Sequence, residues 1–310
     1  MKKLTTLLAA LALGASVHAE WAPKGPVTML IAFAAGGGAD TQARLIASEI
    51  EARKGWKIIP QAATGKGGAV AAAKLKDMPN DGTALAMIVS ETISYNMLAT
   101  KSPGYSEQDF SYLSTTAGTQ FGLVTRSVTG WKTMSDALSS GKKLSFGVMS
   151  PKLADAAYLV GKTLNTEFNI VSLKGGKAVL NAINAGDVDL GWVAGVQAKG
   201  VQSGQLVNLA SGEDERLAMS PEAPTLNELG ADLDLGIHFM FVAPAGLSAE
   251  AQQAWTQAIQ EVINDPSTKA NQFINKAFGG PVAIGGEALK QNVLTGMQAT
   301  RAMMKRVDAD

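Results

Sequence analysis

Short apolar segments alternate with helical patterns along most of this chain, and this alternation restricts the fold more than any other feature. The run from Val27 to Phe33 is apolar, and the helical pattern over 39–53 places Ala43, Ile46 and Ile50 on one face. Further strands are predicted over 83–89, 121–125, 144–148, 169–173, 188–193, 206–210 and 237–243. Helices are predicted over 69–75, 153–164, 177–185 and the whole of the chain beyond 248. Such alternation predicts parallel sheets of the α/β type, with helices on their faces.

The first 19 residues predict a secretory signal peptide. Lys2 and Lys3 precede an apolar stretch over 7–15, and Val17-His18-Ala19 supplies small residues before a cleavage site. This stretch is shorter than the roughly 20 residues that a membrane-spanning helix requires. A frayed helix of a cytosolic protein is the alternative, but such helices are normally amphipathic. We therefore expect the mature protein in the periplasm.

Composition excludes several kinds of chemistry. The chain has no cysteine, which rules out disulfides, thiolate nucleophiles and cysteine-bound zinc or iron–sulfur clusters. Its 27 basic residues balance 27 acidic residues without a basic cluster, so nucleic acid is not an expected partner. Removal of the signal peptide leaves His238 as the single histidine, too few for a multi-histidine metal site. We expect no metal and no cofactor.

No flexible linker divides the chain, although its 310 residues suggest two domains. We therefore expect the strands themselves to cross between two lobes, as in hinge-closing proteins. The expected crossings lie near 121–125 and 237–241. Lobe 1 then comprises 20–121 with 238–310, lobe 2 comprises 122–237, and a ligand cleft lies between them.

The segment from Phe33 to Asp40 (FAAGGGAD) joins a predicted strand to a predicted helix start. Its glycines allow close approach of a ligand, and the free N–H groups of the helix start can bind an anion. Asp40 can hold the loop amides and suits the helix dipole. A nucleotide site is an alternative, but the loop lacks Gly-Lys-Ser/Thr and the G-x-G-x-x-G spacing; a purely structural turn is another. A carboxylate fits better than a phosphate.

Two similar glycine loops lie in different halves of the chain, Thr64-Gly65-Lys66-Gly67-Gly68 and Lys174-Gly175-Gly176. Their occurrence in both predicted lobes indicates a cleft. Ser90-Glu91-Thr92 and Ser150-Pro151-Lys152 follow predicted strands, where α/β sheets place ligand contacts. Glu91 would repel a carboxylate, so it faces solvent or a ligand amine, and Lys152 is a candidate cation or a solvated residue. His238 is interpreted as a structural residue of an apolar strand.

Several short motifs then occur in a specific order along the mature chain. The opening Trp21–Thr28 is similar to W-P-x-x-P-I-T, FAAGGGAD to F-x-P-G-G-x-x-D, and Ala43-Arg44-Leu45 to the A-R-x that follows. The later segments are Thr64–Gly68 (P-G-A-G-G), Asn80–Thr83 (P-D-G-Y/T), Leu173–Gly176 (Y-K-G-G), Gly186–Asp189 (G-x-V-D) and Phe241–Gly246 (F-A-P-A-G). In these motifs the chain resembles the Bug (TctC-like) family, the periplasmic solute receptors of tripartite tricarboxylate transporters.

The resemblance implies a two-lobed α/β periplasmic binding protein, a type II-like Venus flytrap in which each lobe is a mainly parallel sheet flanked by helices. It also implies a monomeric, non-enzymatic receptor that binds a mono-, di- or tricarboxylate and delivers it to a pair of membrane permease subunits. We carry the family's ligand contacts over to this chain, and we add Ala35 because it stands in the first glycine loop and Lys152 because it follows a predicted strand. The expected ligand contacts are then Ala35, Gly36, Gly37, Gly38, Asp40, Thr64, Gly67, Gly68, Ser90, Thr92, Ser150, Lys152, Lys174, Gly175 and Gly176.

Departures from the family pattern concern the distal end of the ligand. Ala35 stands where a proline is common, and the segment from Gly191 to Gly195 lacks polar residues. Lys66 and Lys152 replace small or neutral residues, which suggests a ligand with a second negative group. Two other functions stay open: a receptor that docks on a sensor kinase, and a hydrolase or isomerase that uses His238 or Glu91. The latter lacks a base–nucleophile arrangement.

Overall fold

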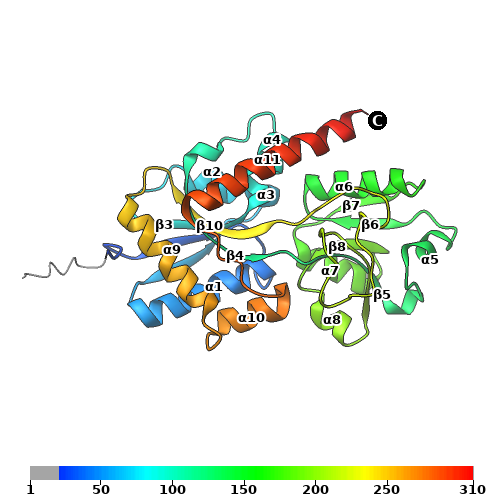
Figure 1. Cartoon of the computed structure of the whole chain (residues 1–310), viewed down its shortest axis with the longest axis horizontal. Coiled ribbons are helices and arrows are strands. Elements are labelled where there is room, and N and C mark those ends of the chain that lie inside the picture. The colour runs from blue at the N-terminus through cyan, green and yellow to red at the C-terminus, as the bar shows by residue number, and fades with distance from the viewer. Residues whose placement is uncertain (1–20, 310) are drawn as a thin grey trace, which may run out of the picture.

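The computed structural model describes residues 21–309, so the predicted signal peptide lies outside the described residues. Two five-stranded sheets form the centres of two lobes that lie side by side (Figure 1). The first sheet has the order β2 (Ile58–Ala62), β1 (Val27–Ile31), β3 (Ala84–Val89), β10 (His238–Pro244) and β4 (Phe110–Gly118). The second has the order β7 (Asn169–Ser172), β6 (Ser145–Val148), β8 (Leu190–Ala194), β5 (Phe121–Arg126) and β9 (Leu206–Ser211).

Helices flank both sheets (Figure 1). In the first half of the chain these are α1 (Gly38–Lys54), α2 (Ala69–Leu75), α3 (Ser90–Ile93), α4 (Tyr95–Leu98) and α5 (Met134–Leu138). The remaining helices are α6 (Pro151–Thr163), α7 (Gly176–Ala185), α8 (Ala198–Gln202), α9 (Ala249–Asn264), α10 (Lys269–Phe278) and α11 (Gly286–Asp308). Within residues 21–309, no helix combines the length and apolar character needed to cross a membrane. The two-lobed α/β architecture expected from the sequence is therefore present.

Alternation of side chains explains how the first sheet holds helices on both faces. Leu85 and Met87 of β3 pack in the same cluster as Ile46 of α1, whereas Ala86 and Ile88 pack in the cluster that contains the apolar side of α2. All six residues of β3 are buried, as expected for a strand covered on both faces. The sheet therefore forms the middle layer of three.

Both sheets are mixed, with as many antiparallel as parallel strand pairings, where the sequence led us to expect mainly parallel sheets. Strand β1 runs parallel to β2 and β3, while β10 runs antiparallel to β3 and β4. In the second sheet, β6 runs parallel to β7 and β8, while β5 runs antiparallel to β8 and β9. The antiparallel pairings all involve β10 or β5, the strands at which the chain enters each sheet from the other. The chain passes from β4 directly into β5, and it returns to the first sheet at β10.

The two passages between the sheets are bonded to each other. The backbone N–H of Thr119 donates to the carbonyl of Ile237 at 2.8 Å, and the N–H of Ile237 donates to the Thr119 hydroxyl at 3.0 Å. The Glu213 carboxylate, which follows β9, accepts the N–H of Phe121 at 2.7 Å. These bonds form one connected hinge region. The exact residue limits of the two lobes stay a prediction.

The C-terminal helices return to the first sheet. Helix α9 packs on β4 and α1, and the Trp255 indole of α9 donates to the carbonyl of Gly82 at 3.1 Å. Helix α11 begins against β4 and extends towards α6 of the other lobe (Figure 1). At its far end, the Arg306 guanidinium donates to the carbonyls of Ala231 and Asp232, at 3.0 and 2.7 Å. This helix therefore bridges the first sheet and the segment before β10.

Candidate ligand-binding site

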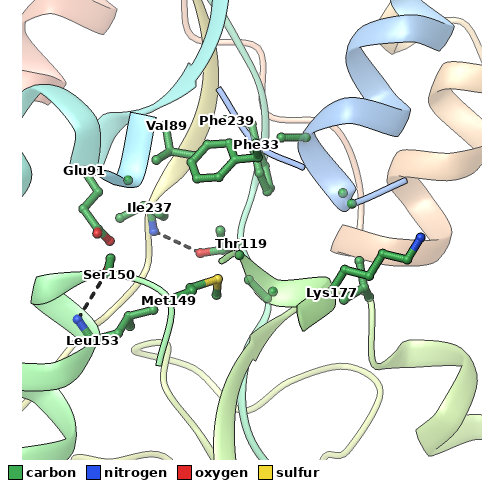
Figure 2. A pocket seen from close by; sticks show the side chains of 18 of the residues that line it. Phe33, Val89, Glu91, Thr119, Met149, Ser150, Leu153, Lys177, Ile237 and Phe239 are labelled. Atoms are coloured by element: carbon green, nitrogen blue, oxygen red, sulfur yellow. Dashed lines mark hydrogen bonds between the residues drawn. The ribbon is translucent and has the colours of Figure 1, made fainter. Parts of the chain in front are cut away.

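A cleft of about 700 Å³, including its open side, lies between the two sheets. The start of α1, the end of β3 and the start of β10 line it from one lobe, and the starts of β5, α6 and α7 line it from the other (Figure 2). The strands of each sheet that precede these helices end at the cleft. This is the edge at which open α/β sheets bind their ligands.

The start of α1 contributes backbone donors rather than side chains. Gly37 precedes the helix in extended conformation without a side-chain cap, and Gly37, Gly38 and Ala39 line the cleft. The first N–H groups of a helix have no partner within the helix and carry partial positive charge. A Cβ at Gly38 would lie 2.7 Å from the ring of Phe278, so glycine is required there. The 17-residue helix therefore presents an anion-binding end to the cleft.

Asp40 holds this loop from behind. Its Oδ2 accepts the N–H of Gly36 at 2.9 Å, and its Oδ1 accepts Nε of Arg44 at 2.8 Å. Asp40 is only 4% exposed and does not line the cleft. The carboxylate thus orders the glycine loop, as the sequence suggested, and does not itself face a ligand.

Side chains also hold the second glycine loop, here through a backbone carbonyl. Gly67 lines the cleft, and its carbonyl accepts the Thr92 hydroxyl and the Asn96 amide, both at 2.9 Å. Gly68 has a φ of +98°, and a Cβ there would lie 2.4 Å from Oγ1 of Thr92. The loop therefore needs glycine for its backbone conformation and for its close contact with Thr92.

The second lobe adds another helix start and a cation. Gly175 has a φ of +92°, and Gly175, Gly176 and Lys177 line the cleft at the start of α7. The Lys177 amine lies across the cleft beside the first glycine loop, 2.8 Å from the position that a Cβ of Gly36 would occupy. Figure 2 shows this side chain pointing towards the start of α1. The positive ends of two helices and one ammonium group therefore meet at this end of the cleft.

Most other side chains along the cleft are apolar. They come from the strand ends and helix starts of both lobes: Phe33, Ala34, Ala39, Val89, Phe121, Met149, Leu153, Ala194, Val196, Ile237 and Phe239. The ring of Phe239 packs against Phe278 with centroids 4.9 Å apart, which fixes one wall. The cleft therefore suits a ligand with an apolar body.

Glu91 occupies the side of the cleft opposite Lys177 (Figure 2). It is 3% exposed, and this burial raises its pKa, although Lys152 and the side chains of Ser150 and Asn96 act in the other direction. Ser150 caps α6 by accepting the N–H of Leu153 at 3.4 Å. The carboxyl group of the first lobe thus meets the start of α6 in the second lobe.

Lys152 is directed away from the cleft. Its buried amine donates to the carbonyl of Leu235 at 3.1 Å, and the residue does not line the cleft. His238 also lies outside the lining. Burial lowers the pKa of its imidazole, and its backbone N–H donates to the Ser90 hydroxyl at 3.2 Å. Both residues thus contribute to structure around the cleft.

The residues predicted from the sequence divide into two sets. The cleft is lined by Gly37, Gly38, Gly67, Ser150, Gly175 and Gly176. The lining does not include Ala35, Gly36, Asp40, Thr64, Gly68, Ser90, Thr92, Lys152 or Lys174. Contact of either set with a ligand stays a prediction.

The sequence reasoning missed the apolar walls, Thr119 and Lys177. A partial signal for the walls was present, because Phe33, Val89 and Met149 stand at the ends of predicted strands. Lys177 directly follows the Lys174-Gly175-Gly176 loop at the predicted helix start. Its position in the first turn of a helix that follows a glycine loop could have predicted a cation at the cleft.

The model of the tripartite tricarboxylate transporter family receptor matches residues 42–295 of this chain. The chain belongs to this family. A relative, the "UPF0065 protein in gbd 5′region" of Cupriavidus necator, is 27% identical over 272 residues, which cover 85% of this chain and 82% of the relative. The sequence resemblance to the Bug (TctC-like) receptors is thereby confirmed.

Solved structures of this receptor family share the fold. The periplasmic binding protein BugD superposes with a TM-score of 0.81 at 20% identity, covering 93% of this chain and 99% of BugD. The R. palustris protein Rpa4515, solved with adipate, gives a TM-score of 0.79 at 22% identity, covering 92% of this chain and 96% of the other. Both comparisons extend over both lobes of the receptor.

Proposed function

We propose that this receptor captures a small organic carboxylate in the cleft between its lobes and delivers it to the membrane subunits of a tripartite tricarboxylate-type transporter. The observation that carries the proposal is that the N-terminal ends of α1 and α7, one from each lobe, line the same cleft. A carboxylate placed between them would bond to both sets of N–H groups. Because these contacts come from both lobes, binding would favour closure.

Family membership and the solved relatives support this function. The name of the family describes receptors of tripartite tricarboxylate transporters, the BugD structure is of a periplasmic binding protein, and Rpa4515 was solved with a carboxylate. Under the proposal the receptor works as a monomer in the periplasm, binds its ligand without converting it, and docks on a pair of permease subunits.

Thermal-shift measurements test ligand capture. A panel of mono-, di- and tricarboxylates is compared with glucose and putrescine as uncharged and cationic controls, and isothermal titration calorimetry gives the affinity of each hit. We expect one or more carboxylates to raise the melting temperature and the controls to leave it unchanged, because a ligand that binds only the folded state stabilises it. Absence of binding by every carboxylate would refute the proposal.

Two further measurements test delivery and the absence of turnover. Uptake of the labelled ligand should be lost when the gene is deleted and restored by the wild-type gene. Unchanged uptake together with a lost transcriptional response would instead indicate a signalling receptor. Ligand recovered from the protein after long incubation should give an unchanged NMR spectrum; a converted product would indicate an enzyme.

A further inference from the structure

The two ends of the cleft differ in charge. At one end lie the starts of α1 and α7 and the Lys177 amine; at the other lies Glu91 (Figure 2). The first end attracts a carboxylate through backbone N–H groups and an ammonium group. The second end presents a carboxyl group that is almost fully removed from water, since Glu91 is 3% exposed. A ligand that spans the cleft therefore meets positive groups at one end and a buried carboxyl group at the other.

No cation at the Glu91 end is directed into the cleft from the described residues that line it. Lys152, the nearest basic side chain acting on Glu91, donates instead to the carbonyl of Leu235 and stays outside the lining. Lys66, the other lysine expected to meet a distal negative group, is exposed and also outside the lining. A distal anion would therefore meet the Glu91 carboxyl group with no cation directed at it from the lining, because Lys152 acts on Glu91 from outside the cleft.

The polar side chains along the cleft are already bonded within the protein. The Thr119 hydroxyl donates to Glu213 at 3.0 Å and accepts the N–H of Ile237 at the same distance. The Ser150 hydroxyl caps α6, and the Ser150 side chain also acts to lower the pKa of Glu91. The middle of the cleft therefore offers mainly carbon surface, which favours an apolar body over a chain of hydroxyl or carboxyl groups.

From this arrangement we infer that the ligand carries a single carboxylate on an apolar body, and that Glu91 is the residue that rejects ligands with a second carboxylate at the far end. The inference rests on the proposed function, because it assumes that the first carboxylate binds at the start of α1. A distal carboxylate would lose its water here with no cation directed at it, which is costly, and it could lie against Glu91 only while the Glu91 carboxyl group holds a proton. Rejection of this kind sets specificity as effectively as an attractive contact.

Matched ligand pairs test the inference on the wild-type protein. Hexanoate and adipate share one chain length, and benzoate and terephthalate share one ring, so each pair differs by the second carboxylate. We expect each monocarboxylate to bind at least about tenfold more tightly than its partner in calorimetry at neutral pH. Adipate or terephthalate binding as tightly as its partner would overturn the inference but leave the receptor function standing. Failure of all four, together with all other carboxylates, would overturn the proposed function and the inference with it.

The substitution Glu91→Gln tests the residue itself. It keeps the shape of the side chain and removes its charge, so the affinity ratio of adipate to hexanoate should rise about tenfold. Glu222→Gln, at an exposed position outside the cleft, is the matched control and should leave the ratio as in the wild type. Circular dichroism and the melting temperature check that both variants are folded. An unchanged affinity ratio of adipate to hexanoate in folded Glu91→Gln would refute the role of Glu91. If that variant fails to fold, the ligand pairs measured on the wild-type protein decide the substrate class.

Discussion

The Glu213 carboxylate accepts a hydrogen bond from the Thr119 hydroxyl at 3.0 Å, which joins the loop after β9 to the passage between β4 and β5. Thr119 also bonds to Ile237 on the other passage, so Glu213 belongs to the hinge region. Burial raises the pKa of Glu213 to about 7, although the hydrogen bonds from Phe121 and Thr119 act in the other direction. This hinge carboxyl group therefore titrates near neutral pH.

Stability should depend on pH through Glu213. Its ordinary pKa is 4.5, so the folded protein holds the proton more tightly than the unfolded chain. The stabilising contribution is complete below pH 4.5 and is lost as the pH rises through about 7. Relative to wild type, Glu213→Gln should gain up to about 3 kcal/mol in free energy of unfolding across this window. Urea unfolding at a series of pH values measures the difference.

The control for Glu213 is Glu215→Gln, at an exposed position two residues along the same loop. Its free energy of unfolding should follow that of the wild type at every pH. A constant difference between Glu213→Gln and wild type over the whole range would contradict the assigned pKa.

Asp40→Ala should weaken ligand binding without unfolding the protein. The substitution removes the acceptor of the Gly36 N–H and so releases the first glycine loop. Loss of one such charge-assisted bond corresponds to an affinity loss of about tenfold. Calorimetry with the best carboxylate of the panel measures this loss, with Arg44→Ala as the milder control because Arg44 is 46% exposed. Wild-type affinity in Asp40→Ala would exclude the role of this loop in binding.

Lys177→Ala should lower carboxylate affinity more than Lys174→Ala. Lys177 lines the cleft beside the first glycine loop, whereas Lys174 lies outside the lining. Because Lys177 is exposed, we expect a loss of only about threefold to fivefold. The loss should shrink as salt is added, since screening weakens exposed charge pairs. Titrations at low and high ionic strength measure it, and a larger effect of Lys174→Ala would reverse the assignment.

Gly68→Ala should destabilise the fold by more than about 2 kcal/mol. The new Cβ would sit on a backbone with φ of +98° and lie 2.4 Å from the buried Thr92 side chain. Gly130→Ala is the matched control, because Gly130 also has positive φ, at +77°, but has no atom within 4 Å of the new Cβ. We expect the control to cost about 1 kcal/mol. Equal losses in urea unfolding would show that only backbone strain matters at Gly68.

Much of the fold could be predicted from the sequence, but β2 and β4 could not. Strand β2 contains Pro60 and is largely exposed at the sheet edge, so it lacks an apolar pattern. Strand β4 is buried, yet it contains Thr115 and Thr116, whose hydroxyls bond to Val282 and Gln42. In a sequence, threonines of this kind are read as loop residues, because their hydrogen-bond partners lie far along the chain. The strand was therefore not predicted.

The candidate site was predictable where backbone conformation required it. Glycines at Gly38, Gly67 and Gly175 are needed for close contact or positive φ, and this need can be recognised in a single sequence. The apolar walls could not be recognised, because Phe121 at a cleft and Phe146 in the core look alike before the lobes are assembled.

The position of β10 between β3 and β4 governs the order in which the molecule can be assembled. Every strand of the second sheet precedes β10 in the chain, so that sheet can pair completely while β3 still has an open edge and β4 has no partner strand. Open edges invite pairing with other chains. A chain that ends before His238 should therefore aggregate through its N-terminal half, and folding of the intact chain should wait on its last strand. In this receptor, the strand made last joins β3 to β4 in the sheet begun first.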